Sequence, residues 1–201
     1  MRILFLTNNS VSQPLLEWLR DEAGEEVVLW DNKITAQTIN ERRPDYLISY
    51  SYRYLIRKDV IDLRRGRIIN LHISFLPWNR GTDPNAWSFL EDSPKGVTIH
   101  QIDEGLDTGP ILVQKEVEFD ETRETLQSSY ETLHREIQTL LIEHWDQIKH
   151  FGIEPKPQPS GGTKHLSKDF EPIKALFSKE GWGIPIPELK KRFRAWAEGK
   201  R

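Results

Sequence analysis

The residues best able to do chemistry lie in two short stretches, residues 70–81 and 105–110. Asn70 and His72 are two residues apart, so on a strand they face the same side and place an amide beside an imidazole. Asp107 stands between glycines, in a turn that could bring it to the carboxyl edge of a parallel sheet, where ligands bind in such folds. Together these groups suit the attack of an amine on an activated acyl carbon: the amide can stabilise an oxyanion, and the other two can move protons.

The elements that would position these residues follow from the apolar pattern of the chain. Short apolar runs predict strands, and apolar residues at helical spacing predict helices. The expected strands cover residues 2–7, 27–30, 46–50, 67–73, 96–102 and 111–119, and the expected helices cover 15–19, 34–43, 85–90 and 121–150. Alternating strands and helices imply an α/β fold with a mainly parallel sheet and helices on both faces.

The composition changes after Phe151. Residues 151–162 are rich in Pro and Gly and can hold neither a helix nor an interior strand, which predicts a connector that becomes flexible along its length. Two short elements are expected after it, around residues 170–178 and 187–197. The predicted organisation is a catalytic domain over residues 1–150, followed by a connector and short C-terminal extension over 151–201.

The composition also excludes several classes of protein. The chain has 201 residues, a formal charge of −3 and no Cys, which excludes disulfides and thiol nucleophiles and favours a reducing, cytoplasmic location. No apolar run approaches the roughly 18 residues that span a bilayer, and the N-terminus lacks a signal-peptide pattern. The near-neutral charge argues against nucleic-acid binding as the main task. Residues 188–201, with six Lys or Arg and two Glu, form an exception that is interpreted as a solvated helix face rather than a phosphate-gripping or tRNA-gripping arm.

The usual nucleotide-binding signatures are absent. The loop after the first expected strand, residues 7–12, contains no Gly, so NAD and FAD are disfavoured, and no G-x-x-x-x-G-K-[ST] loop occurs. Asn9 and Ser10 could bind an anion at the N-terminus of a helix. Helix capping is the simpler interpretation of the same two residues.

Three motifs in order resemble those of the 10-formyltetrahydrofolate-dependent formyltransferases. They are Asn70-Leu71-His72 with Leu76-Pro77 and Arg80-Gly81, then Gly96-Val97-Thr98-Ile99-His100, then Asp103 to Ile111. The resemblance covers about residues 1–150 and implies a Rossmann-like fold of the formyltransferase type. It also implies a catalytic triad of Asn70, His72 and Asp107, with 10-formyltetrahydrofolate as formyl donor and co-substrate.

The resemblance further implies two walls of a folate site and an acceptor site. The folate walls would be Tyr52, Arg53, Tyr54 and Leu55 on one side and Ile102, Asp103, Glu104 and Gly105 on the other. Ser74, Trp78, Asn79, Arg80 and Gly81, together with Asn9 and Ser10, would bind the acceptor. This stretch is similar to that of enzymes acting on nucleotide-linked amino sugars, which implies a dTDP-4-amino-4,6-dideoxyhexose type of acceptor.

Several alternatives remain open. The acceptor could be methionyl-tRNA or another amine, or the chain could be a non-catalytic folate-binding protein of the same fold. A metal site from His72, His100, Asp103 and Asp107 is the main competing chemistry, but Asn70 is a poor ligand and the family needs no metal. His100 is interpreted as structural or supporting. No membrane association is expected, and a homodimer is implied by resemblance only.

Overall fold

The computed structural model describes residues 1–177 and 179–199, and its strands form a mixed, mostly parallel six-stranded sheet. The order across the sheet is β2-β1-β3-β4-β6-β7. These strands are β1 (Arg2–Leu6), β2 (Glu26–Trp30), β3 (Tyr46–Tyr50), β4 (Ile68–His72), β6 (Gly96–Gln101) and β7 (Ile111–Glu116). The predicted α/β class is therefore confirmed, and all six expected strands occur with shifts of a few residues at their ends.

The chain folds into two compact units that interleave along the sequence. Unit 1 comprises Met1–His72, Ile99–Val113 and Gln138–Gln158, and unit 2 comprises Ile73–Thr98, Gln114–Ile137 and Pro159–Arg201. Strands β6 and β7 and helix α5 (Leu126–Lys149) contribute residues to both units. Residues 151–158, the start of the predicted connector, thus belong to unit 1.

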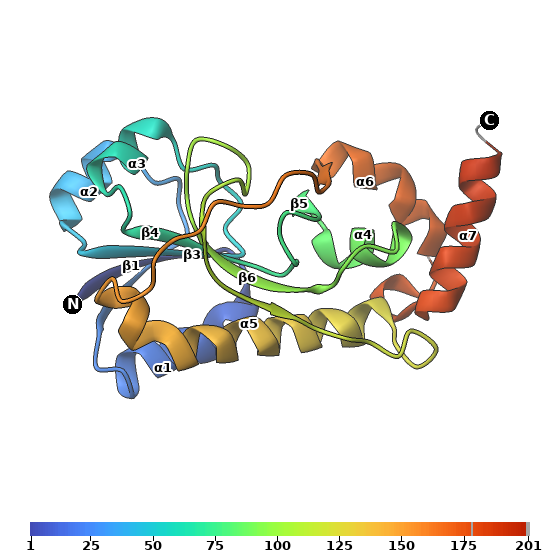
Figure 1. Cartoon of the computed structure of the whole chain (residues 1–201), viewed down its shortest axis with the longest axis horizontal. Helices are drawn as coiled ribbons and strands as arrows, with labels where there is room; N and C mark the ends of the chain where they lie inside the picture. Colours follow the sequence, from blue (N-terminus) through green and yellow to red (C-terminus); the bar gives the residue numbers. More distant parts are fainter. Residues whose placement is uncertain (178, 200–201) are drawn as a thin grey trace. The chain divides into compact units, whose positions relative to one another are not determined.

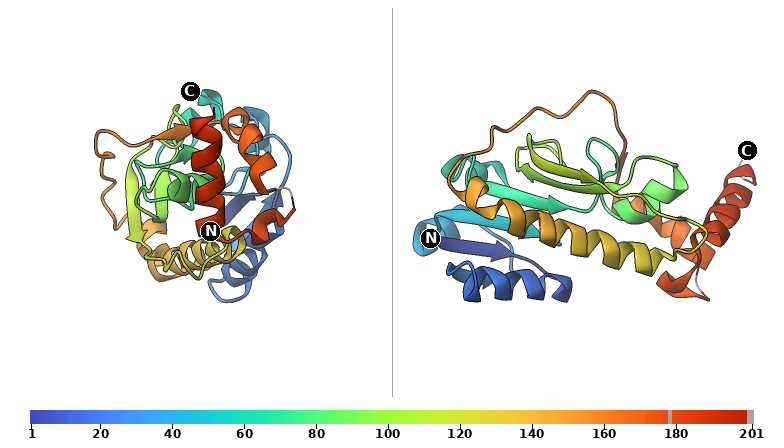
Figure 2. Two further views of the ribbon diagram at one scale, coloured as in Figure 1. Left: turned by 90° about the vertical axis from the view of Figure 1, so that its right-hand side faces the viewer. Right: turned by 60° about the horizontal axis from the view of Figure 1, so that its bottom comes forward.

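Unit 1 is built on parallel strands, and the central strand β3 is buried on both faces. β1 pairs in parallel with β2 and with β3, and β3 pairs in parallel with β4. Every residue of β3 is buried, as expected where helices cover both sides of a parallel sheet. Helices α2 (Ala36–Arg42) and α3 (Lys58–Leu63) lie over one face, and α1 (Gln13–Asp21) and the C-terminal half of α5 lie over the other (Figures 1 and 2).

Local capping explains where several helices begin and end. Thr35 accepts a hydrogen bond from the Thr38 amide, so α2 begins at Ala36, and Arg43 in the left-handed region ends it before Pro44. The Thr125 hydroxyl accepts from the Ser128 amide, which starts α5 five residues later than predicted. Helix α3 was not predicted, because it spans six residues and buries only Val60 and Ile61.

Unit 2 gathers short elements around an apolar cluster. Helix α4 (Pro84–Leu90), helix α6 (Ser167–Lys174) and helix α7 (Ile186–Glu198) all contribute to this cluster, with Leu126, Phe177 and Ile184. Two-residue strands β5 (Arg80–Gly81) and β8 (Lys164–His165) pair in parallel; such short strands leave no sequence pattern. The predicted tail helices occur as α6 with the short η2 (Ala175–Phe177) and as α7, while Ser178, the end of the first prediction, lies outside the described residues.

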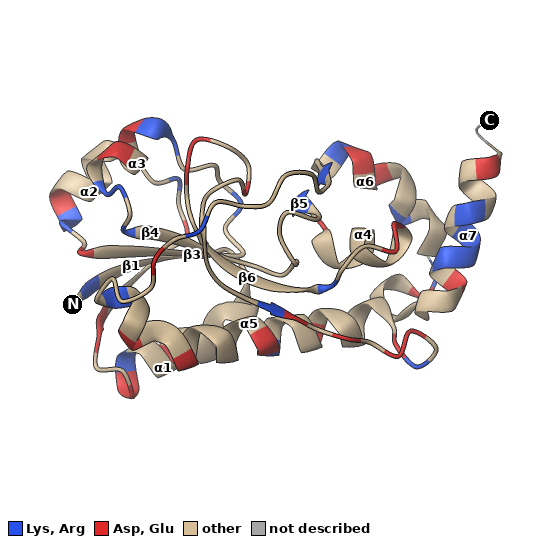
Figure 3. Cartoon of the chain, in the orientation of Figure 1, with Lys and Arg blue, Asp and Glu red and all other residues tan. Residues whose placement is uncertain are grey.

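Two further observations concern the surface and the possibility of membrane insertion. In the described part of the chain, no helix combines the length and the apolar character needed to cross a bilayer. The basic residues of α7 stand out in Figure 3, and several are neutralised: Lys190 contacts Asp92 and Glu121, and Arg192 contacts Glu180 and Glu188. Lys200 and Arg201, counted in the predicted basic segment, lie outside the described residues.

Candidate active site

Strand β4 supplies the first two groups of the site. Asn70 and His72 alternate with the buried Leu71, so their side chains share one face of the strand. β4 belongs to unit 1 and pairs with β3 over Ile68 to Leu71, which holds the backbone of Asn70 rigidly. The sequence prediction that these two residues face the same side is consistent with this geometry.

The turn between β6 and β7 supplies the carboxylate. The Asn70 Nδ2 donates to Asp107 Oδ1 at 3.1 Å, and His72 Nδ1 lies 3.8 Å from Asp107 Oδ2. Asp107 has a φ of 52°, a left-handed conformation that is uncommon outside Gly and is found at functional sites. The three residues predicted as catalytic are thus brought together within unit 1.

A second histidine completes the group. His100 is 1% exposed, its Nδ1 donates to the Gln101 carbonyl at 2.8 Å, and its Nε2 lies 3.3 Å from Asn70 Nδ2. In the neutral tautomer that has its proton on Nδ1, Nε2 is the acceptor for the Asn70 amide, and Nε2 also lies 3.5 Å from Asp107 Oδ1. Both hydrogens of that amide are therefore directed, one to His100 and one to Asp107.

The loop that carries Asp107 is organised by its own side chains. Asp103 Oδ1 accepts from the Gly105 amide at 3.0 Å and from the Thr108 hydroxyl at 2.7 Å. At Gly109 a Cβ would lie 1.8 Å from the Gln101 carbonyl oxygen, so only Gly fits where the turn returns to β6. The loop therefore presents Asp107 from a constrained backbone.

Gln158 is a contact of the site that the sequence analysis missed. Its Nε2 donates to the carbonyl oxygens of Asp107 and Gly109, at 2.8 and 2.9 Å. The connector before it is also attached, because Ile111 and Lys156 exchange two backbone hydrogen bonds of 2.8 Å. An attached first part is compatible with a connector that becomes flexible along its length, which stays a prediction, and no local pattern in the sequence signals these particular contacts.

The first predicted folate wall follows β3. The Tyr52 hydroxyl donates to the Asn32 carbonyl at 2.6 Å and accepts from the Ile34 amide at 2.9 Å, so that hydroxyl is used inside unit 1, and burial raises its pKa. The Arg53 guanidinium lies over the Tyr54 ring at 4.8 Å and donates to its hydroxyl. The Leu55 side chain is 73% exposed and is free to contact a ligand.

The second predicted folate wall begins at the end of β6. The Ile102 amide donates to the Ile68 carbonyl, which anchors the loop to β4, and Asp103 holds the loop internally as described above. Glu104 and Gly105 are exposed, and the Glu104 carboxylate contacts Lys58 Nζ at 2.5 Å. The two predicted walls therefore both belong to unit 1, and their contact with folate stays a prediction.

The loop after β1 is shaped by asparagine side chains. Asn9 Oδ1 accepts from the Val11 amide at 3.0 Å and caps the short η1 (Ser10–Ser12). The Asn8 side chain donates to the Asp31 carbonyl and accepts from the Arg53 amide, which ties this loop to the loops after β2 and β3. The capping interpretation of Asn9 matches this geometry, and acceptor binding by Asn9 and Ser10 stays a prediction.

The predicted acceptor residues after β4 lie in unit 2, where several are part of the fold. The Ser74 hydroxyl donates to the Trp78 carbonyl at 2.8 Å. Asn79 is fully buried, donates to the Ser93 hydroxyl at 2.8 Å and accepts from the Thr163 hydroxyl at 3.1 Å. The Trp78 side chain is half-buried, as are the β5 residues Arg80 and Gly81, so these three retain surface for a ligand.

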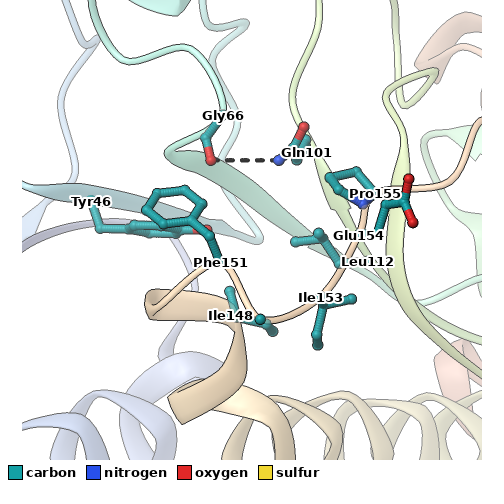
Figure 4. Close-up of a pocket in the computed structure, with 10 residues that line it drawn as sticks. Tyr46, Gly66, Gln101, Leu112, Ile148, Phe151, Ile153, Glu154 and Pro155 are labelled. Carbon is teal, nitrogen blue, oxygen red and sulfur yellow. Dashed lines mark hydrogen bonds between the residues drawn. The ribbon is translucent and has the colours of Figure 1, made fainter.

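Two other features bear on ligand binding. Within residues 1–177 and 179–199, no cluster of three or more His, Asp or Glu has the arrangement of a metal site. A separate cavity of about 350 Å³ opens in unit 1 beneath the connector (Figure 4). It is lined by Tyr46, Gln101, Ile148, Phe151 and Ile153 among others, and contains none of the predicted site residues.

Comparisons with curated proteins point to one family. A family model described as Formyl transferase matches residues 1–144. The methionyl-tRNA formyltransferase of Halorhodospira halophila is 35% identical over 166 residues, which are 81% of this chain and 51% of that protein. The dTDP-4-amino-4,6-dideoxyglucose formyltransferase of Mycobacterium tuberculosis is 34% identical over 134 residues, 67% of this chain and 56% of that protein. The chain spans about half the length of these curated relatives.

A solved structure resembles the chain over nearly its whole length. The formyltransferase PseJ from Anoxybacillus kamchatkensis, crystallised with UDP-4,6-dideoxy-4-formamido-L-AltNAc and tetrahydrofolate, is 44% identical with a TM-score of 0.85. That match covers 96% of this chain and 100% of the other. A likely sugar N-formyltransferase from Mycobacterium tuberculosis is 29% identical with a TM-score of 0.75, covering 86% of this chain and 78% of that chain. Since the family match covers well over half of the 201 residues, the chain belongs to the formyl transferase family.

Proposed function

We propose that the protein transfers a formyl group from 10-formyltetrahydrofolate to the 4-amino group of a UDP-linked 4-amino-4,6-dideoxy sugar. The amine nitrogen attacks the formyl carbon, and a tetrahedral intermediate forms. The bond between that carbon and N10 of the folate then breaks. The amine loses one proton and N10 gains one, so the products are a formamido sugar nucleotide and tetrahydrofolate.

The observation that carries the reaction is the group formed by Asn70, His72 and Asp107. It places an amide donor 3.1 Å and an imidazole nitrogen 3.8 Å from the two oxygens of one carboxylate. His72 and Asp107 are largely buried, with side chains 8% and 13% exposed, so their interactions are only weakly screened by water. This is the set of groups that acyl transfer to an amine requires.

Each group takes a defined role in the proposed reaction. His72 in its protonated form donates to the formyl oxygen as negative charge develops there. Asp107 orients His72 and accepts the proton of the attacking amine, directly or through a water molecule. The Asn70 amide, which donates to Asp107 in the ligand-free arrangement, supplies a second donor to the oxyanion.

The acceptor is inferred from the relatives. PseJ, 44% identical over the whole of its chain, was crystallised with a UDP-linked 4-formamido sugar, which is the kind of product that the proposed reaction yields. The relative named as a dTDP-4-amino-4,6-dideoxyglucose formyltransferase is 34% identical over 67% of this chain. The higher identity and coverage favour uridine over the thymidine of the sequence-based expectation.

The donor is proposed to bind between the loops after β3 and β6. The exposed Leu55 side chain offers an apolar surface to a planar ring. The Asp103-organised loop offers backbone groups at residues 102–105. PseJ was crystallised with tetrahydrofolate, which supports the same donor for this chain.

The proposal is tested by following tetrahydrofolate release from 10-formyltetrahydrofolate with a panel of acceptors. The panel contains UDP- and dTDP-linked 4-amino-4,6-dideoxy sugars, with initiator methionyl-tRNA and glycinamide ribonucleotide as controls. We expect turnover with the UDP-linked amino sugar and a mass gain of one formyl group minus a hydrogen on its 4-amine. Equal or faster turnover of methionyl-tRNA would replace the proposed acceptor, and absence of turnover with every amine would refute the reaction.

A further inference from the structure

The side chain of Gln158 is hydrogen-bonded to the β6–β7 turn, which carries the Asp107 carboxylate. One amide nitrogen, Nε2, donates both of its hydrogens to that turn: to the Asp107 carbonyl at 2.8 Å and to the Gly109 carbonyl at 2.9 Å. Both contacts lie within unit 1 and join residues about fifty positions apart in sequence. The contacts are made to the backbone, so they act on where Asp107 stands without consuming its carboxylate.

The position of Gln158 is itself secured by the segment before it. Lys156, two residues earlier, exchanges two backbone hydrogen bonds of 2.8 Å with Ile111, which begins β7. Phe151, at the start of the segment, has the Arg67 guanidinium over its ring at 4.8 Å. Residues 151–158 are thus held at two points, Phe151 and Lys156, and the side chain of Gln158 at the end of this segment reaches the turn.

The turn needs such support because its backbone is unfavourable by itself. Asp107 has a φ of 52°, and a non-Gly residue in this region persists only when its surroundings hold it there. Gly109 packs against the Gln101 carbonyl so closely that no side chain fits. Two carbonyl groups that point toward one donor would otherwise repel each other or require water.

We propose that Gln158 is a positioning residue for formyl transfer, which acts by holding the backbone of the Asp107 turn. This inference rests on the proposed function. It gives Gln158, which lies outside the segment matched by the family model (residues 1–144), a role in positioning the catalytic carboxylate. These two hydrogen bonds of Gln158 go to backbone carbonyls, so through them it acts on the placement of the Asp107 carboxylate relative to Asn70 and His72.

The effect should appear in the chemical step more than in binding. The Asp107 carboxylate lies 3.1 Å from Asn70 Nδ2 and 3.8 Å from His72 Nδ1, so a shift of about 1 Å breaks one contact or the other. A misplacement of that size can cost on the order of 100-fold in rate. The two hydrogen bonds of Gln158 go to Asp107 and Gly109 and not to the predicted folate walls, and the wall at residues 102–105 has its own hydrogen bonds through the Asp103 carboxylate.

The test compares Gln158→Met, which keeps the length but has no donor, with Gln158→Glu, which keeps the shape and loses the amide hydrogens. Gln147→Met, at an exposed position of α5 in the same unit, is the matched control. We expect both Gln158 variants to lower kcat by roughly 10- to 100-fold while KM for donor and acceptor stays within about threefold. The control should keep both parameters, and all three variants should retain the far-UV circular dichroism of the wild type.

A second measurement does not depend on turnover. Hydrogen–deuterium exchange of a peptide covering residues 103–110 should accelerate in Gln158→Met and remain unchanged in Gln147→Met. A kcat within twofold of the wild type in both Gln158 variants would overturn the proposal, and so would a larger KM change than kcat change. If the wild type transfers no formyl group, the proposed function fails, and unchanged exchange in Gln158→Met would then refute the holding of the turn separately.

Discussion

At the residue scale, three side chains of the site are linked by directed hydrogen bonds. His100 donates through Nδ1 to a backbone carbonyl, Nε2 of its neutral tautomer accepts from Asn70, and the second Asn70 hydrogen goes to Asp107. Under the proposed reaction this arrangement couples two steps. When Asp107 takes the amine proton its carboxylate becomes a weaker acceptor, so the Asn70 hydrogen is released toward the oxyanion at the moment that charge develops.

The same scale shows what spacing can and cannot predict. Asn70 and His72 were predictable because strand periodicity places residues i and i+2 on one face, and Asp107 because it stands in a Gly-bounded turn. Asn79, predicted to bind the acceptor, is fully buried and bonded to Ser93 and Thr163. Burial is set by neighbours distant in sequence, so the motif alone could not reveal it.

We expect His72→Ala and Asp107→Asn each to lower kcat by about 100-fold or more. General acid–base groups contribute roughly 10²- to 10⁴-fold, and each of these residues has such a role in the proposed reaction. The measurement is tetrahydrofolate release with the UDP-linked amino sugar. His150→Ala, which removes an imidazole 65% exposed just after α5, should retain wild-type turnover. Near wild-type rates in either site variant would remove that residue from the mechanism.

At the element scale, the β6–β7 turn shows how local backbone geometry and distant contacts combine. The Asp103 carboxylate organises the loop from within, through the Gly105 amide and the Thr108 hydroxyl, and this part could be inferred from neighbouring residue types. The hydrogen bonds from Gln158 could not be inferred in this way. They join positions about 50 residues apart, and Gln158 lies in a segment whose Pro and Gly content predicts a connector without regular structure. Strands β5 and β8 could not be predicted from the sequence for a different reason: each has only two residues, and two residues show no periodicity.

We expect Gly109→Ala to damage both stability and turnover. Its Cβ would lie 1.8 Å from the Gln101 carbonyl oxygen, so either β6 or the turn must move, at a cost of about 1–3 kcal/mol in the free energy of unfolding. The displaced Asp107 should lower kcat by at least tenfold. Gly183→Ala is the control, because a Cβ there meets nothing within 4 Å. Urea unfolding measures the free energy of unfolding of both variants, and steady-state kinetics measures their kcat. Equal values for Gly109→Ala and Gly183→Ala would contradict the steric argument.

Helix α5 carries a buried imidazole that should make unit 2 sensitive to acid. Burial lowers the pKa of His134 from 6.5 to about 4, so the unfolded chain binds this proton more readily than the folded one. The stabilisation from a neutral His134 is complete above pH 6.5 and is lost as the pH falls toward 4. Between pH 7 and pH 5 this amounts to about 2 kcal/mol.

The variant His134→Gln, which has no titrating group, isolates this contribution. We expect the free energy of unfolding of the wild type to fall by about 2 kcal/mol more than that of His134→Gln between pH 7 and pH 5. Urea titrations at the two pH values provide the measurement. Parallel losses in the two proteins would show that the imidazole is protonated in the folded state with an ordinary pKa.

At the scale of the whole molecule, the fold class was readable from the sequence and the division into units was not. Alternating strand and helix patterns sufficed for the sheet, because each parallel strand is a short apolar run. The chain passes from one unit to the other within β6, within β7 and within α5. This division depends on contacts between residues distant in sequence, which the apolar pattern does not reveal. The predicted boundary at residue 150 therefore describes composition, whereas residues 138–158 and 159–199 divide by packing.

Ligand linkage tests the whole molecule without requiring turnover. If tetrahydrofolate binds the folded chain alone, a concentration of 100 times its Kd stabilises that state by about 2.7 kcal/mol, which raises the Tm by roughly 5–10 °C for a chain of this size. Asp107→Asn should keep this shift, because the proposed folate contacts are at Leu55 and residues 102–105, and the substitution keeps the size of the side chain and removes only its charge. Leu55→Asp should reduce it, since a carboxylate would replace the exposed apolar surface offered to the ring. The proposed folate site would be wrong if Asp107→Asn abolished the Tm shift and Leu55→Asp left it intact. Asp107 would then act in folate binding, and the chemical role assigned to its carboxylate would lose its support.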